Sequence, residues 1–151
     1  MNKKILALLV VFIAAISIAS VCAAELTKEN DFDGKFKMNI MENSTFEKVV
    51  DASDQNAYLS DQSWSDNETA LVCYYDKDMA SVLSDLKSNS GFMDEPKTEG
   101  NLTILEDNTS PDDATYSFKY MVGVSSPDNK TVMIASNDLD LAKEYAKTVS
   151  F

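Results

Sequence analysis

The most hydrophobic run of the chain lies at its start. Lys3 and Lys4 precede an apolar run over residues 5–18, and small residues follow it up to Ala24. A basic start, an apolar segment and a small residue before the cleavage point are typical of a secretory signal peptide. We therefore expect residues 1–24 to be a signal peptide that directs the protein out of the cytoplasm.

Two other fates of the N-terminus lead to a membrane. The apolar stretch over residues 5–24 has about the length that spans a bilayer as a helix, so a retained anchor is the alternative to cleavage. Lipid attachment at Cys22 is disfavoured, because the bulky Val21 stands where that reaction requires a very small residue.

Alternating apolar and polar positions predict strands in the rest of the chain. Residues 25–34 are expected to be a polar lead that ends in the turn formers Asp33 and Gly34. The predicted strands then cover residues 35–40, 57–62, 69–75, 102–105, 115–124 and 131–136. Two hairpins are expected among them, over residues 57–75 and 115–136, and the strand at 69–75 is expected to be central.

Apolar residues at helical spacing predict two longer helices. The first contains Met79, Val82, Leu83 and Leu86, and is expected to begin at Asp76 or Asp78 and to end near Gly91. The second begins at Asn137 or Asp138 and presents one apolar face, formed by Leu141, Ala142, Tyr145, Ala146 and Val149.

A short helix is expected between the first strand and the first hairpin. Ser44 and Glu47 have the spacing of a capping box, and Phe46, Val49 and Val50 then fall on one face. Together these elements predict an α+β fold: a mainly antiparallel sheet of about five to six strands, covered by two longer helices and one short one. Residues 35–151 are expected to form a single domain.

The first strand and the end of the chain carry a resemblance. The strand with Phe36, Met38 and Ile40, the two hairpins and the ending over residues 131–151 resemble the PsbP/Mog1 type of α+β sandwich. Such domains are mostly binding or accessory modules, so the resemblance implies no catalytic residue. The lysine-only, Asn/Asp-rich composition is also similar to that of small exported proteins of archaea.

Charge limits the partners of the protein. Without residues 1–24, 11 basic residues face 25 acidic ones, so the net charge is near −14. All basic residues are lysines, and arginine, which contacts phosphate and guanine in a bidentate manner, is absent. We expect no nucleic-acid partner and no attraction to anionic lipid surfaces.

Cys73 is the one cysteine that remains after cleavage at Ala24. It lies in an apolar run and is expected to be a buried hydrophobe.

The residue types also limit the chemistry. The chain contains no histidine, which removes Ser-His-Asp and Cys-His catalysis and histidine metal sites. Two fragments of the β-lactamase signature occur, Ser84-x-x-Lys87 and Ser65-Asp66-Asn67. We interpret both as coincidences, because their order is reversed and Lys-Thr-Gly is absent. Paired carboxylates could still cleave sugar polymers, with Trp64 as a stacking platform. We predict no catalytic residue, and Trp64 is expected to be a packing residue.

Calcium is the one cofactor that the acidic residues suggest, and we expect none to be bound. The candidate ligand pairs are Asp31 with Asp33, Asp76 with Asp78, and Asp138 with Asp140. None of the three pairs completes a calcium-binding loop. For Asp31 and Asp33 read as part of an EF-hand loop, Ile40 stands at the position of the bidentate glutamate. The later pairs are explained more simply as helix caps.

Five of the ten asparagines beyond residue 24 lie in N-x-S/T sequons: Asn43, Asn67, Asn101, Asn108 and Asn129. At the observed serine and threonine content, chance would place about two there. The excess predicts N-glycosylation, and accidental sequons on a Ser/Thr/Asn-rich surface are the alternative.

These patterns predict an exported, acidic, glycosylated and non-enzymatic protein. We expect it at the cell surface, in the envelope or outside the cell, where it acts as a binding or accessory module. One alternative is a small carboxylate-dependent hydrolase of extracellular polysaccharide. The other is a membrane-tethered accessory subunit, if residues 1–24 are retained.

Overall fold

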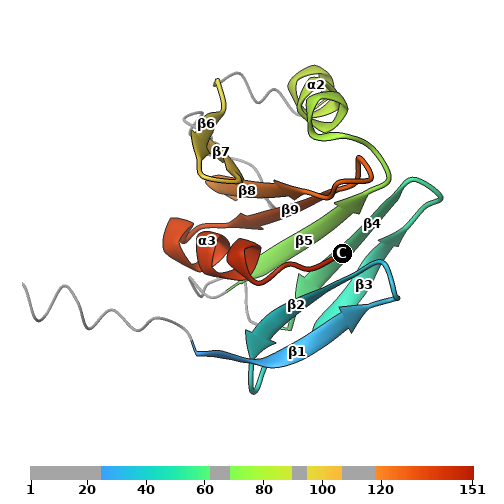
Figure 1. The fold of residues 1–151 in the computed structure, drawn as a ribbon. Helices are drawn as coiled ribbons and strands as arrows, with labels where there is room; N and C mark the ends of the chain where they lie inside the picture. Colours follow the sequence, from blue (N-terminus) through green and yellow to red (C-terminus); the bar gives the residue numbers. More distant parts are fainter. Residues whose placement is uncertain (1–24, 62–68, 90–94, 107–117) are drawn as a thin grey trace, which may run out of the picture.

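The structure, a computed structural model, describes residues 25–61, 69–89, 95–106 and 118–151. These residues form nine strands and two helices (Figure 1). The strands are β1 (Leu26–Phe32), β2 (Phe36–Met41), β3 (Phe46–Asp51), β4 (Gln55–Ser60), β5 (Ala70–Tyr75), β6 (Lys97–Glu99), β7 (Leu102–Glu106), β8 (Tyr120–Ser125) and β9 (Thr131–Ser136). The helices are α2 (Met79–Asn89) and α3 (Leu139–Lys147).

Seven strands form one antiparallel sheet in the order β3-β4-β5-β9-β8-β7-β6, and β1 and β2 form a separate hairpin. In Figure 1 the β1–β2 hairpin and α3 lie on one face of the large sheet, and α2 lies on the other. The central strand β9 is buried along its whole length. The fold is therefore a β-sheet covered on both faces.

The predicted α+β architecture is wrong. The described residues hold nine strands instead of five to six, and two helices instead of three, so the fold is mostly β. The strands that the sequence did not predict are β1, β3 and β6. Two of them are the edges of the large sheet and the third belongs to the hairpin. Strands β1 and β6 are too polar to show a clear apolar pattern, and the apolar residues of β3 have a helix-like spacing.

Strand β1 replaces most of the predicted polar lead. Its residues alternate between partly buried and exposed positions, and it pairs along its length with β2. Asp33 and Gly34 join the two strands with φ angles of 55° and 69°, and Lys35 N donates to Phe32 O at 3.1 Å. Two central residues with positive φ form the type I′ turn that suits a hairpin. The Asp-Gly pair is thus a hairpin turn and not the end of a lead.

Strand β3 replaces the predicted short helix. Ser44 does not cap a helix, because its hydroxyl donates to Asp61 Oδ1 at 3.4 Å and the neighbouring Thr45 N donates to the same oxygen at 3.0 Å. Val49 and Val50 are β-branched, and β3 pairs with β4 on both sides of a bulge at Val49. Pairing across the sheet therefore overrides a weak local helix signal.

The elements with a strong apolar pattern are confirmed. Strands β4 and β5 pair as the predicted hairpin, and β5 lies inside the sheet between β4 and β9. Asp78 accepts hydrogen bonds at the start of α2 from Ser81 N and Ser81 Oγ. Asp138 caps α3, since its Oδ1 accepts from Asp140 N at 2.9 Å and from Leu141 N at 3.1 Å.

Each face of the sheet has its own core. The core under the hairpin and α3 is rich in aromatic side chains, and it contains Phe32, Phe36, Tyr58, Tyr74 and Tyr145. The core under α2 is smaller, with Ala57, Cys73, Val82, Leu105 and Met133 as its buried residues. The larger core is thus the one that attaches the hairpin to the sheet.

Residues 1–24, which carry the signal-peptide and anchor predictions, lie outside the described residues. Within the part of the chain that the structure describes, neither helix has both the length and the apolar character that crossing a bilayer requires. The two interpretations of the N-terminus remain predictions.

Candidate functional site

The described sequon asparagines lie in turns on the surface. Asn43 is exposed in the turn after β2, which Ser44 N closes by donating to Met41 O at 3.0 Å. Asn101 is exposed in the two-residue turn between β6 and β7. Asn129 is exposed in the β8–β9 turn with a φ of 60°. Asn67 and Asn108 lie outside the described residues.

The strand register places these turns at two ends of the sheet. Asn43 precedes the start of β3, which pairs with the end of β4 beside the start of β5. Asn101 and Asn129 lie in hairpin turns near the opposite end, where β5 finishes. A bulky glycan at any of these three positions would project from a turn without crossing the face of the sheet.

The Asn129 sequon is only partly accessible after folding. Its hydroxyl residue, Thr131, is fully buried in β9, and Thr131 Oγ1 donates to Lys77 O at 2.9 Å. The complete Asn-Lys-Thr motif is thus available only before β9 joins the sheet. Any modification of Asn129 that reads the whole motif would precede folding.

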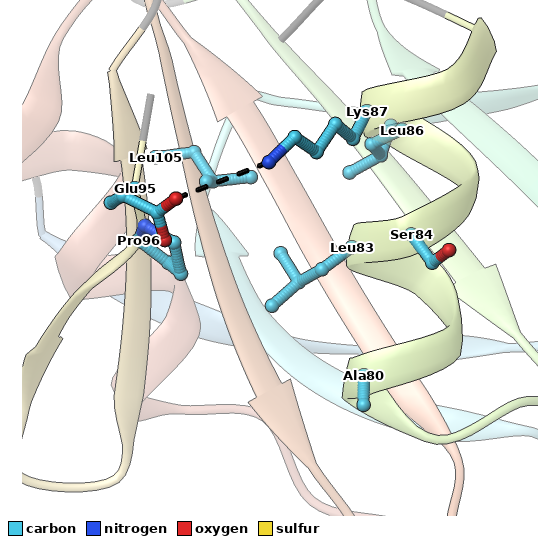
Figure 2. A pocket seen from close by; sticks show the side chains of 8 residues that line it. All are labelled: Ala80, Leu83, Ser84, Leu86, Lys87, Glu95, Pro96 and Leu105. Atoms are coloured by element: carbon cyan, nitrogen blue, oxygen red, sulfur yellow. Dashed lines mark ion pairs between the residues drawn. The ribbon is translucent and has the colours of Figure 1, made fainter. Parts of the chain in front are cut away.

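A groove of about 380 Å³ lies between α2 on one side and β7 with the segment just before β6 on the other. Its walls are mainly apolar, with Leu83, Leu86, Pro96 and Leu105 among the lining residues. Figure 2 shows an ion pair from α2 to the opposite wall, with Lys87 Nζ 3.9 Å from Glu95 Oε1. Both charged groups are strongly exposed, so this pair contributes little stability.

Ser84 and Lys87 both line this groove, but they do not act on each other. In Figure 2 the Ser84 hydroxyl and the Lys87 ammonium group point in different directions. The ammonium group lies instead beside the carboxylate of Glu95. A serine becomes a nucleophile only with a base within hydrogen-bond reach. The groove can therefore receive an apolar group, and its side chains form no Ser-Lys pair.

A polar network links the β1–β2 turn to the large sheet. Tyr58 Oη donates to Asp33 Oδ2 at 2.8 Å, and Lys48 Nζ lies 2.6 Å from the same oxygen. Lys48 Nζ also lies 3.5 Å from Asp51 Oδ1, which accepts from Asn56 Nδ2 at 2.7 Å. The hydrogen bonds from Lys48 and Tyr58 lower the pKa of Asp33 below its usual 3.8. Burial, with the nearby Asp33 carboxylate, raises the pKa of Tyr58.

The Asp33 network predicts a pH dependence of stability. The folded state lowers the pKa of Asp33, so its contribution is present above the unfolded pKa and is lost as the pH falls through the folded one. We expect Asp33→Asn to lower the urea midpoint at neutral pH, and this difference from wild type to shrink below about pH 4. Urea titrations across this pH range measure it. Asp128→Asn, an exposed change of the same charge, is the control, and a difference that does not vary with pH would contradict the network.

Three of the other candidate calcium ligands, Asp31, Asp78 and Asp138, have structural partners. Asp31 Oδ1 accepts from Gly34 N at 2.6 Å, and Asp78 and Asp138 cap the helices as described above. Among the described residues, no group of three or more acidic, cysteine or histidine side chains could hold a metal ion. The structure thus brings no two of the three proposed pairs together.

Cys73 is buried, as the sequence predicts. Burial raises the pKa of its thiol to about 11, although a hydrogen bond with Tyr75 acts in the opposite direction. The thiol stays protonated at neutral pH and is a poor nucleophile.

Sequence reasoning missed one exposed feature. Val49 and Val50, expected on one face of a short helix, lie on the edge strand β3 and are 50% and 40% exposed. The signal was present in the sequence as two adjacent β-branched residues between charged ones, a composition that favours an edge strand. Trp64, the predicted packing residue, lies outside the described residues.

Searches against protein-family models, curated proteins and solved structures found no match to this chain.

Proposed function

We propose that this protein is an exported, acidic N-glycoprotein that acts at the cell surface, in the envelope or outside the cell as a non-enzymatic binding or accessory module. The observation that carries the proposal is that all three described sequon asparagines lie in exposed turns. Glycan attachment requires an exposed asparagine, and these three positions meet that requirement. Asparagine also favours exposed turns for conformational reasons, so the excess of sequons in the sequence supports glycosylation beside the exposure.

Two features of the sequence support the binding role. The absence of histidine removes the commonest catalytic base and metal ligand. The resemblance to PsbP/Mog1-type domains, which are mostly binding or accessory modules, points in the same direction. The acidic surface favours a partner that carries positive charge.

N-terminal sequencing and intact mass of the protein from the native host test the proposal. Protein is recovered separately from the membrane fraction and from the medium. We expect a start at or near Glu25 and a mass above that of the bare polypeptide. A start at Met1 in the membrane fraction would indicate the tethered accessory subunit instead. A mass equal to that of the bare polypeptide in both fractions would contradict the proposed glycosylation.

A further inference from the structure

The two edges of the seven-stranded sheet differ in how they meet solvent. At one edge β6 has three residues, including Lys97 and Glu99, and all are exposed. A very short charged strand is a common way to prevent pairing with another chain. At the other edge β3 has six residues and carries the exposed Val49 and Val50. The edge formed by β3 is therefore the longer and the more apolar of the two.

Strand β3 is paired on one side only. It pairs with β4, and no other described strand lies along its outer side. A bulge between Lys48 and Val50 shifts the register within it. Along an edge strand, the outward N–H and C=O groups remain available for another chain. The side chains beside them include the two valines, which gain from burial.

Acidic side chains flank the valines. Glu47 and Asp51 are both exposed on β3. Lys48 lies 2.6 Å from Asp33 and 3.5 Å from Asp51, so these three groups together keep one negative charge in addition to that of Glu47. The edge thus combines a small apolar centre with a negative border, which suits a partner with aliphatic and basic side chains.

We propose that β3 binds an extended segment of a partner protein that combines aliphatic and basic residues, and that this segment adds an eighth strand to the sheet. Main-chain hydrogen bonds to an edge strand supply affinity, and side chains beside it supply specificity. A second copy of this chain fits less well, because its own β3 has the same acidic flanks and its net charge is −12 with residues 1–24 included. The inference rests on the proposed role as a binding module.

The test uses the purified protein as its host produces it and a short capped peptide of alternating lysine and valine. Titration calorimetry at physiological salt measures the affinity, and hydrogen exchange follows the backbone amides of β3. We expect binding, with slower exchange at residues 46–51. A capped peptide of alternating glutamate and valine is expected to bind far more weakly.

Val50→Lys and Thr98→Lys form a matched pair, because each adds one positive charge at an exposed position, on β3 and on β6 respectively. We expect Val50→Lys to weaken peptide binding about tenfold and Thr98→Lys to change it little. Val50→Thr, which keeps a β-branched residue, provides a variant that preserves the strand. Circular dichroism checks that all three variants are folded.

Several results would overturn the proposal. The first is that the lysine–valine peptide does not bind. The second is that Val50→Lys and Thr98→Lys lose the same peptide affinity. The third is that hydrogen exchange of the β3 amides does not change when the peptide is added. Dimerisation that Val50→Lys abolishes would show that a second copy occupies the edge. The intact mass of the same sample reports glycosylation independently, so failure of the edge inference and failure of the glycoprotein proposal are distinguishable.

Discussion

Phe32→Ala is expected to lower the free energy of unfolding by about 3–5 kcal/mol. The Phe32 side chain is 1% exposed and lies at the centre of the aromatic core. Its ring stacks on Phe36 with centroids 4.5 Å apart, and contacts Tyr58 and Phe46 edge to face at 4.9 and 5.6 Å. These contacts join the β1–β2 hairpin to β4 and β3, so the truncation loosens the hairpin from the sheet.

Urea unfolding of wild type and variant measures this loss. Phe151→Ala is the matched control, since Phe151 is 47% exposed and should contribute much less. Phe32→Leu should fall between the two, because it keeps most of the apolar volume. A loss below about 1 kcal/mol for Phe32→Ala would mean that the hairpin is not held by this side chain.

Gly123→Val is expected to destabilise the protein by about 1–3 kcal/mol through overpacking. Gly123 is buried in β8 under helix α2. A Cβ atom there would lie 2.5 Å from Met133 Sδ and 2.6 Å from Met79 Cε. The missing side chain thus leaves the space in which Met79 packs α2 against the sheet.

A double-mutant cycle identifies the clash. Met79→Ala removes the helix side of the contact, so Gly123→Val should cost less in that background, with a coupling of about 1 kcal/mol. Met121→Ala, which truncates another methionine of the same core, is the control. Simple additivity of Gly123→Val and Met79→Ala would contradict the packing described here.

The sequence predicts the centre of the fold well. Strand β9 is apolar on both faces and is buried throughout, and β5 beside it is nearly continuous in apolar residues. Helix α3 carries both an apolar stripe and a capping aspartate, Asp138. In these elements local propensity and burial agree, so the pattern along the chain is sufficient.

The periphery depends on partners that are distant in sequence. Most residues of β1 are polar, and the strand is specified by its pairing with β2 and by Phe32 at its end. Strand β3 carries a helix-like spacing, but Asp61 binds the residues that would cap such a helix. A pattern confined to neighbouring residues does not contain these interactions.

Some features of the candidate sites are visible in the sequence, and others depend on residues that are distant along the chain. The sequons are visible in the sequence, whereas the exposure of Asn43, Asn101 and Asn129 follows only from the turns that contain them. The contact between Asp33 and Tyr58 joins residues that are 25 positions apart. The edge position of β3 is only weakly encoded, because the spacing of Phe46, Val49 and Val50 is helix-like and Val49 and Val50 alone favour a strand.

Glycopeptide mass spectrometry of the protein from its native host tests the central claim most directly. It reports the occupancy of each asparagine, and Asn30 and Asn39, which lie outside any sequon, serve as internal controls. We predict glycan on Asn43, Asn101 and Asn129 and none on the controls. Bare asparagine at all three positions in exported protein would contradict it.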